Sequence, residues 1–319
     1  MDEYPPPDER WVRIEKNAYK LEWSKKTDEE KKRARKIMKQ IKIRNKVKNI
    51  INGIIDDVVN LSEGKKEIIK IFNTKVRGEA IDTSSKNDKH CGAEGHILEE
   101  LMGIKPNGKN EPDILGYEMK KDSKRITFGD WSAEEYLFSK KRSSLLRINE
   151  KDIHVPRSLF IELFGTPNKK KGGRYSWSGK CFPSISGYND CGQVIEINEM
   201  GDIVIKYNPE KDQRDTSKLL KELKIQQNEV IIIAYWSKER IKEKVENKFN
   251  HNGFFICKKE KGVYVNICFG KRLNYELFIN EFKKGIIFID SGMYAGNNRP
   301  YSQFRANDKL WHSLIVEEY

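Results

Sequence analysis

The segment from residue 94 to residue 120 constrains this chain more than any other. It contains a Pro-Asp pair ending at Asp113 and a Glu-x-Lys triplet running from Glu118 to Lys120. Glu118 and Lys120 are two residues apart, so both side chains leave the same face if this stretch is a β-strand. Asp113 lies five residues before Glu118, which is the wrong parity for one straight strand. The sequence therefore predicts two short strands joined by a turn.

A turn at Leu115 and Gly116 would bring the two carboxylates together. Glycine accepts backbone angles that return a chain antiparallel, so we expect Asp113 to end one strand and face Glu118 on the next. Two carboxylates on adjacent strands form a hard oxygen site that suits Mg²⁺. Lys120 beside them can orient or deprotonate an attacking water and offset charge on a phosphate. These side chains are what metal-assisted cleavage of a phosphodiester needs.

A helix is predicted just before the Pro-Asp pair. Leu98, Leu101 and Met102 have helical spacing, and Gly103 is a typical stop. Glu99 lies on the flank of this apolar stripe, so we expect it near the carboxylate pair.

The extended motif resembles a known family of nucleases. The run GHILEELMGIKPNGKNEPDILGYEMKKDS is similar to the catalytic segment of the MvaI/BcnI-like restriction endonucleases and, more distantly, to MutH and Sau3AI. The resemblance implies a PD-(D/E)xK nuclease with Asp113, Glu118 and Lys120 as the motif triad and Glu99 as the supporting helix glutamate. It also implies Mg²⁺ held by Asp113 and Glu118. The expected fold is α/β, with a mixed sheet flanked by helices and two lobes around a DNA cleft.

The same residues have plainer interpretations. Glu-x-Lys in a chain with 34% charged residues is usually a solvated strand face, and Pro-Asp usually starts a turn. Their combined spacing favours a nuclease, and the resemblance implies a type II restriction endonuclease that cuts DNA at a short specific site. Two alternatives stay open: a MutH-like strand-nicking endonuclease with the same site, and a DNA-binding protein without catalysis.

The charge of the chain agrees with a nucleic-acid partner. Lys and Arg number 61 against 48 Asp and Glu, which gives a formal net charge of +13. Neutralisation of phosphates supplies most of the sequence-independent affinity for DNA. We therefore expect double-stranded DNA as the partner. The resemblance adds that relatives cut as monomers, while the oligomeric state and the target sequence of this chain stay open.

Several other classes of protein are excluded. The five cysteines form no CxxC pair, so zinc-finger and disulfide-scaffold architectures do not fit, and a reducing compartment does. We expect a cytoplasmic protein, because the sequence shows no signal peptide and no run of 18 apolar residues. A phosphate-binding P-loop is also missing from the sequence, so no nucleotide cofactor is expected.

Pattern changes along the chain predict three parts. Residues 1–64 form an N-terminal extension, with a capping box at Thr27 opening a long basic helix through residues 31–61. Residues 65–192 form the catalytic lobe, including a DNA-contacting loop. Residues 193–319 form the C-terminal DNA-recognition lobe. In it we expect hairpins at 193–208 and 254–269, strands at 230–236 (buried) and 286–290, and a helix that Ser237 caps and that ends near Phe249. The lysines of the long helix contact either solvent or the DNA backbone.

Two segments are candidates for DNA contacts. Residues 164–180 interleave basic and aromatic side chains on a loop, which suits a groove or a backbone contact. Residues 286–311 resemble the C-terminal recognition segment of the MvaI/BcnI-like enzymes. Within it, Gln303 and Arg305 share one strand face, and these residue types pair with adenine and guanine edges. Each segment has a plainer alternative. Residues 164–180 could be a charged loop in solvent, and residues 286–311 could be a surface hairpin with an Arg–Asp ion pair. The candidates are Lys169, Lys170, Lys171, Arg174, Tyr175, Asp290, Tyr294, Asn297, Asn298, Arg299, Gln303 and Arg305.

Overall fold

The computed structural model divides the chain into two compact units, Met1–Glu63 and Gly64–Tyr319. The residues that it describes are 27–29, 31, 63–81, 93–105, 108–146, 148 and 154–319. In the first unit, Asp28, Glu29 and Lys31 are helical. The rest of the predicted basic helix lies outside the described residues.

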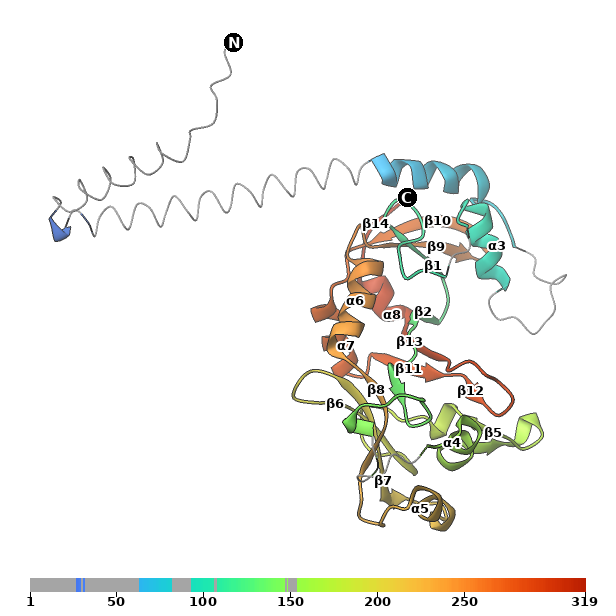
Figure 1. Cartoon of the computed structure of the whole chain (residues 1–319). Coiled ribbons are helices and arrows are strands. Elements are labelled where there is room, and N and C mark those ends of the chain that lie inside the picture. The colour runs from blue at the N-terminus through green and yellow to red at the C-terminus, as the bar shows by residue number, and fades with distance from the viewer. Residues whose placement is uncertain are drawn as a thin grey trace. The chain divides into compact units, whose positions relative to one another are not determined.

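The strand with the Glu-x-Lys triplet forms one edge of a four-stranded sheet. β1 (Glu118–Lys121) pairs in parallel with β9 (Phe254–Glu260). β9 continues through the predicted hairpin into β10 (Val263–Gly270), and β14 (Ile315–Glu318) forms the other edge. This sheet lies at the same end of the unit as the helix of residues 64–75 (Figure 1).

Two helical segments accompany this sheet. Residues 64–75 are helical, and α3 (Ala93–Leu101) is the predicted helix, followed by Gly103 at a φ of 75°. Glu94 in the first turn of α3 connects the helix to the sheet. Its Oε2 lies 2.8 Å from the Lys121 ammonium, and its Oε1 accepts a hydrogen bond of 3.0 Å from the Tyr264 hydroxyl. A carboxylate in this position also interacts favourably with the helix dipole.

A second sheet follows β1 directly. β2 (Arg125–Asp130) pairs with β13 (Ser302–Asn307), which pairs with β11 (Ile287–Ser291), all antiparallel. Burial alternates along β11 and β13, so one face packs on the core and the other is partly exposed. The predicted strands at 286–290 and 302–305 are therefore confirmed.

The third sheet corrects the interpretation of residues 164–180 as a loop. β4 (Thr166–Asn168) and β5 (Arg174–Trp177) form a hairpin around the 3-10 turn η2 (Lys169–Lys171), and β12 (Met293–Tyr294) pairs with β5. Gly172 and Gly173 close the turn at positive φ, which local polarity alone does not reveal.

The fourth sheet is antiparallel throughout. β6 (Cys191–Ile197) and β7 (Ile203–Asp212) form the predicted hairpin, β8 (Ile231–Trp236) is the predicted buried strand, and β3 (Glu135–Tyr136) pairs with β8.

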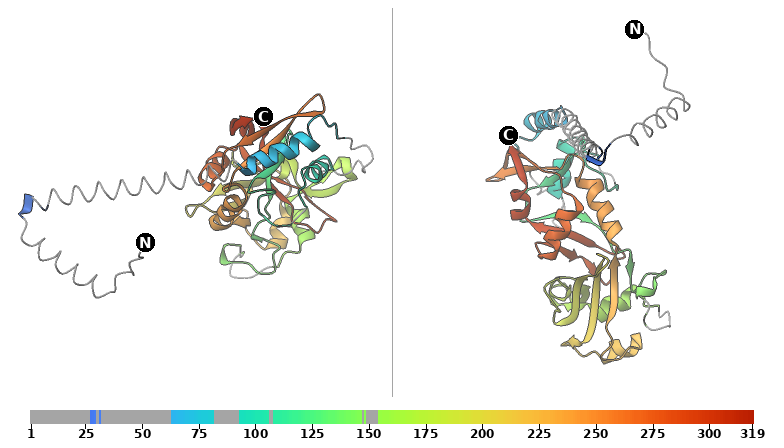
Figure 2. Two further views of the ribbon diagram at one scale, coloured as in Figure 1. Left: turned by 90° about the horizontal axis from the view of Figure 1, so that it is seen from above. Right: turned by 90° about the vertical axis from the view of Figure 1, so that its left-hand side faces the viewer.

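Among the remaining helices, α7 (Tyr275–Lys283) and α8 (Asp308–Ser313) pack against the second sheet, and α4 (Arg157–Phe164) packs against β5 (Figures 1 and 2). Ser237 caps α6 as predicted, because its side chain accepts a hydrogen bond from the Arg240 N–H. The sequence did not indicate α4, which begins directly after Pro156, a residue type that often precedes or opens a helix. The bounds are α4 (Arg157–Phe164), α5 (Ser217–Leu223), α6 (Lys238–Phe249), α7 (Tyr275–Lys283), α8 (Asp308–Ser313), η1 (Ser144–Leu146) and η3 (Gly179–Cys181).

Aromatic side chains join the first two sheets. Phe128 and Trp131 are buried. The ring of Phe128 lies 4.5 Å from that of Trp311 on α8, which in turn lies 4.9 Å from Phe254 on β9. Aromatic pairs at such separations add to the stabilisation from burial, so this cluster gives β1 and β2 a common rigid support.

The described elements confirm the predicted α/β class. All four sheets take strands from both sides of residue 192. The division into lobes 65–192 and 193–319 therefore does not follow sheet boundaries and stays a prediction. Within the described residues, no helix has both the length and the apolarity that a membrane crossing requires.

Candidate active site

The turn before β1 forms as predicted. Leu115 and Gly116 have φ values of 48° and 78°, and Ile114 and Tyr117 form an antiparallel bridge with hydrogen bonds of 3.0 and 2.8 Å. Such left-handed angles are strained for most residues and unstrained for glycine.

Asn252 holds this turn from the segment that links α6 to β9. Its side chain donates to the Leu115 carbonyl at 2.9 Å, and its N–H donates to the Gly116 carbonyl at 3.0 Å. A Cβ at Gly116 would lie 2.7 Å from the Asn252 amide nitrogen, so a larger residue would push these groups apart. The turn and the end of α6 are thereby kept together.

The Asp113 carboxylate folds back onto β1, where its Oδ2 accepts a hydrogen bond of 2.8 Å from the Met119 N–H. Asp113 lies in a bend, so the expectation that it ends a strand is wrong: its carboxylate, and not its backbone, makes the contact with β1. Burial raises the pKa of Asp113, and the nearby Glu118 raises it further, to about 7, although Lys120 and Lys248 oppose the shift.

Glu118 is the centre of the cluster and is only 2% exposed. Its Oε1 lies 2.7 Å from the Lys120 ammonium, which confirms that the two side chains leave the same strand face. The Lys248 ammonium, from the last turn of α6, lies 3.0 Å from the same oxygen. Among the residues that the structure describes, Glu118 Oε2 is buried and has no hydrogen-bond partner.

Lys120 is surrounded by apolar and charged groups. Burial lowers the pKa of its ammonium and the charge of Lys248 lowers it too, while Glu118 acts in the opposite direction. The ammonium also lies 5.4 Å from the ring centroid of Phe249 and 5.9 Å from that of Trp311, within the range of cation–π contacts.

Sequence reasoning missed Lys248. Its place depends on the parallel pairing of β1 with β9, which brings the end of the preceding helix beside β1. The available signal was a lysine near the end of a capped helix that leads into a buried strand. That signal is common in basic chains and is too weak to select one lysine.

Glu99 lies apart from these contacts in the described structure. Its Oε2 is 3.2 Å from Nδ1 of His96, one turn earlier on α3. No hydrogen bond or ion pair joins it to Asp113, Glu118 or Lys120 in the part of the chain that is described. Its catalytic support role stays a prediction.

The two carboxylates fit a divalent cation. Among the described residues, no three His, Cys, Asp or Glu side chains gather in a metal-binding arrangement. A pair is nevertheless sufficient for Mg²⁺, which often takes one or two carboxylates and completes its shell with waters and phosphate oxygens. The orphaned Oε2 of Glu118 supports this fit, because a buried oxygen without a partner is costly and a cation would satisfy it.

The predicted readers Gln303, Arg305 and Asp290 lie on the partly exposed face of the second sheet. Asp290 is the cross-strand neighbour of Gln303, and its Oδ2 lies 2.8 Å from a guanidinium nitrogen of Arg305. The Arg305 Nε also donates to the Thr127 hydroxyl at 3.2 Å. The Arg–Asp ion pair of the structural alternative is therefore present, between Arg305 and Asp290.

The other candidates lie on and beside the third sheet. The Arg174 guanidinium stacks on Tyr294, 3.5 Å from the ring centroid, and the Ala295 N–H donates to the Tyr175 carbonyl at 2.9 Å. The two segments predicted from separate parts of the sequence are therefore neighbours. The hairpin tip exposes Lys169, Lys170 and Lys171, and the loop after β12 exposes Asn298. In the same loop, Asn297 Oδ1 accepts a hydrogen bond from the Arg299 N–H. The Arg299 guanidinium pairs with Asp130.

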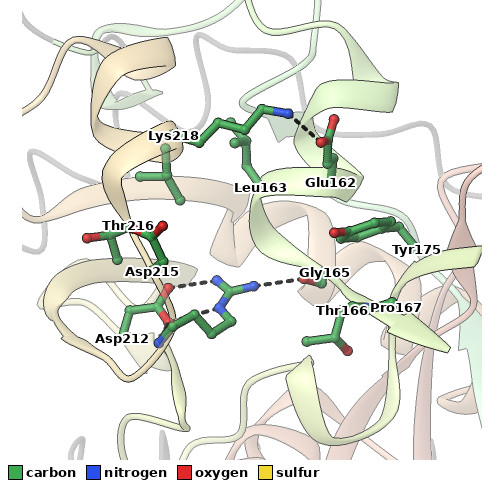
Figure 3. Close-up of a pocket in the computed structure, with 12 residues that line it drawn as sticks. Glu162, Leu163, Gly165, Thr166, Pro167, Tyr175, Asp212, Asp215, Thr216 and Lys218 are labelled. Atoms are coloured by element: carbon green, nitrogen blue, oxygen red, sulfur yellow. Dashed lines mark hydrogen bonds and ion pairs between the residues drawn. The ribbon is translucent and has the colours of Figure 1, made fainter. Parts of the chain in front are cut away.

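A cavity of about 210 Å³ lies between α4, the β4–β5 hairpin and the start of α5 (Figure 3). Arg214 fills its polar side, donating to both oxygens of Asp212 at 2.9 and 2.7 Å and to the Gly165 carbonyl at 2.7 Å. Lys218 points toward Glu162 and pairs with it. These groups satisfy one another, so the cavity has a structural explanation and shares no residue with the cluster around Glu118.

Residues 76–319 match the model of the LlaMI restriction endonuclease family. The chain belongs to this family. It is therefore a DNA-cleaving enzyme, as the resemblance of residues 95–123 implied.

One sequence relative agrees with this assignment. The type II restriction enzyme ScrFI of Lactococcus lactis subsp. cremoris is 40% identical over 269 residues, covering 81% of this chain and 99% of that enzyme. Among solved structures, a complex of the restriction endonuclease MvaI with cognate DNA covers 81% of this chain and 97% of MvaI, with 14% identity and a TM-score of 0.49. MvaI without DNA matches with 11% identity over 82% of this chain and 98% of MvaI, with a TM-score of 0.37.

Proposed function

We propose that this member of the LlaMI family is a type II restriction endonuclease that hydrolyses double-stranded DNA at a short specific sequence and depends on Mg²⁺. Family membership supports DNA cleavage, and the ScrFI relative is by name a type II restriction enzyme. One observation carries the catalytic part of the proposal. The buried Glu118 contacts Lys120 and Lys248 through one oxygen. Its other oxygen has no hydrogen-bond partner among the described residues, and the Asp113 carboxylate lies close enough to interact with it electrostatically.

Asp113 and the free oxygen of Glu118 would hold the metal ion. When bound, Mg²⁺ makes a water more acidic and neutralises charge on the phosphate. The Met119 N–H fixes the Asp113 carboxylate in the direction of the site. Lys120 can donate to the attacking water or to a phosphate oxygen, because Lys248 also holds the Glu118 oxygen that Lys120 contacts. Lys248 keeps the Glu118 carboxylate oriented while Lys120 turns to the substrate.

The division of DNA contacts follows from exposure and geometry. The exposed lysines at 169–171 suit phosphates, which carry no sequence information. Gln303 and Arg305 stand on a strand and present planar polar groups, which suit base edges in the major groove. The +13 charge of the chain would supply the non-specific part of the affinity.

A plasmid assay tests the catalytic proposal. Supercoiled DNA incubated with the protein and Mg²⁺ should yield discrete linear fragments, and EDTA should prevent cleavage. Relaxed circles would identify a nicking enzyme, and intact DNA in every condition would refute the assignment of the cluster.

The variant Lys120→Met should abolish cleavage while leaving binding of the specific site intact in EDTA. Lys121→Met is the matched control, because Lys121 is the adjacent lysine and pairs with Glu94 outside the cluster. Wild-type cleavage by Lys120→Met, or equal loss in both variants, would contradict the role given to Lys120.

A further inference from the structure

Arg157 holds the loop between β12 and β13 from the first turn of α4. One terminal guanidinium nitrogen donates to the Asn297 carbonyl, and the other donates to the Arg299 carbonyl at 3.1 Å. A planar guanidinium fixes both bonds in one geometry, which a flexible lysine cannot do. The distance between these two carbonyls of the loop is therefore set by one side chain.

The surroundings of Arg157 oppose a positive charge. Burial lowers the pKa of its guanidinium, and among the described residues no carboxylate pairs with it. Its Nε is buried without an acceptor, and a cation in the first turn of a helix interacts unfavourably with the helix dipole. The guanidinium also lies 6.0 Å from the ring centroid of Phe138. A residue that costs stability in its own helix is expected where a function requires it.

Further contacts fix the Arg299 end of the loop that Arg157 holds. The Arg299 carbonyl also accepts a hydrogen bond of 2.9 Å from the Tyr301 N–H, and the Arg299 side chain reaches Asp130, with its nitrogen 2.5 Å from Oδ2. Asp130 is the cross-strand neighbour of Gln303. Fixing the Arg299 carbonyl therefore fixes where its side chain leaves the loop, next to the polar face of the second sheet.

We propose that Arg157 is a positioning residue for sequence recognition, and that its two bonds to the loop set the alignment of Arg299 and Asn298 with the bases. This inference rests on the proposed function, because it assumes that the loop faces a specific DNA site. It predicts that Arg157 governs discrimination between sites and contributes little to affinity for DNA of arbitrary sequence.

Two substitutions separate geometry from charge. Arg157→Lys keeps the charge and loses the fork, whereas Arg157→Met loses both. Lys141→Met is the control, because Lys141 is an exposed cation nearby in the sequence whose removal changes net charge equally. Three DNA duplexes serve as probes. The first carries the target site, mapped from the ends of the fragments that the wild-type protein produces. The second carries the same site with one base pair altered, and the third has an unrelated sequence.

Binding to the three duplexes in EDTA gives the decisive measurement. Both Arg157 variants should lower the preference for the mapped site over the altered site by about tenfold or more, the size of one base-specific interaction. Arg157→Lys should bind the unrelated duplex as wild type does, and Lys141→Met should keep the full preference. If Arg157→Lys loses as much site preference as Arg157→Met, recognition needs the two-bond geometry of the guanidinium and not only its positive charge.

The outcomes against the inference are distinct. If Arg157→Lys unfolds at the wild-type temperature and keeps the full site preference, Arg157 has no role in recognition. A loss of preference that appears only together with a lowered melting temperature in both variants would assign Arg157 to the fold alone. If the wild-type protein itself binds all three duplexes equally, the proposed function fails, and this inference fails with it.

Discussion

Lys120 and Lys248 place their ammonium groups on the same oxygen of Glu118, at 2.7 and 3.0 Å, although one comes from β1 and the other from α6. Two cations on one buried carboxylate oxygen leave the second oxygen with its full capacity to accept. In the proposed mechanism the cluster separates two tasks: the lysines orient Glu118, and its second oxygen would hold the metal ion.

Removing Lys248 should weaken both the fold and the reaction. In Lys248→Met, Glu118 keeps one cation, so we expect the free energy of unfolding to fall by about 1–3 kcal/mol. Cleavage should fall by more than the change in the folded fraction, because Lys120 must then stay with Glu118. Lys242→Met, an exposed neighbour on α6, is the control. Chemical unfolding and single-turnover cleavage measure the two effects, and full activity in Lys248→Met would refute the shared role.

Asp113→Asn and Glu118→Gln should each abolish cleavage and retain DNA binding. Each removes negative charge that faces the phosphate, so binding in EDTA should be equal to or tighter than that of wild type. Filter binding and plasmid cleavage test this pair of outcomes. A variant that still cuts at the wild-type rate would show that its carboxylate is only structural.

Neutralising Lys169, Lys170 and Lys171 together should weaken specific and non-specific binding alike. The slope of log K against log salt should become shallower by up to about 3, close to one unit for each lysine that no longer neutralises a phosphate. A triple variant of the exposed lysines Lys221, Lys224 and Lys283 removes equal charge elsewhere and should leave the slope nearly unchanged. A change confined to site preference would contradict the phosphate assignment.

Arg305→Ala separates base reading from the ion pair with Asp290. We expect it to reduce discrimination at the target site by about 1–3 kcal/mol while non-specific binding stays close to wild type. Asp290→Asn removes the ion pair and keeps the guanidinium, so it should retain more discrimination than Arg305→Ala. Equal losses of melting temperature in both variants, with site preference intact, would assign Arg305 to the fold.

Glu94 should make the protein sensitive to acid. Burial raises its pKa, but hydrogen bonds from Lys121 and Lys259 outweigh burial and lower the pKa from 4.5 to about 2. A carboxyl whose pKa is lower in the folded state contributes stability above pH 4.5, and this contribution is lost as the pH falls toward 2. The stability difference between wild type and Glu94→Gln should shrink over that range in urea unfolding. Glu100→Gln, on the exposed side of α3, is the matched control.

The features predicted from sequence depend on residues close together in the chain. The turn at Gly116, the shared face of Glu118 and Lys120, and the cap at Ser237 each follow from spacing or backbone freedom within a few positions. Local rules were therefore sufficient to identify most of the cluster, and the extended motif indicated the family.

What the sequence did not reveal depends on how distant segments pair. Lys248 joins the cluster only because β9 lies parallel to β1, and Arg157 reaches the loop at Asn297 only because β12 pairs with β5. Asp113 departs from the predicted strand because its carboxylate finds the Met119 N–H. Neither periodicity nor residue type encodes these contacts in a single sequence.

The pairing of β1 with β9 has a consequence for synthesis of the enzyme. A ribosome that has delivered Asp113, Glu118 and Lys120 has yet to translate Lys248 and the strand that begins at Phe254, the only strand neighbour of β1 in the described structure. A nascent or prematurely terminated polypeptide therefore carries the nuclease motif on an unpaired segment, without an assembled site. The proposed active site around Glu118 can therefore assemble only after most of the polypeptide has been made.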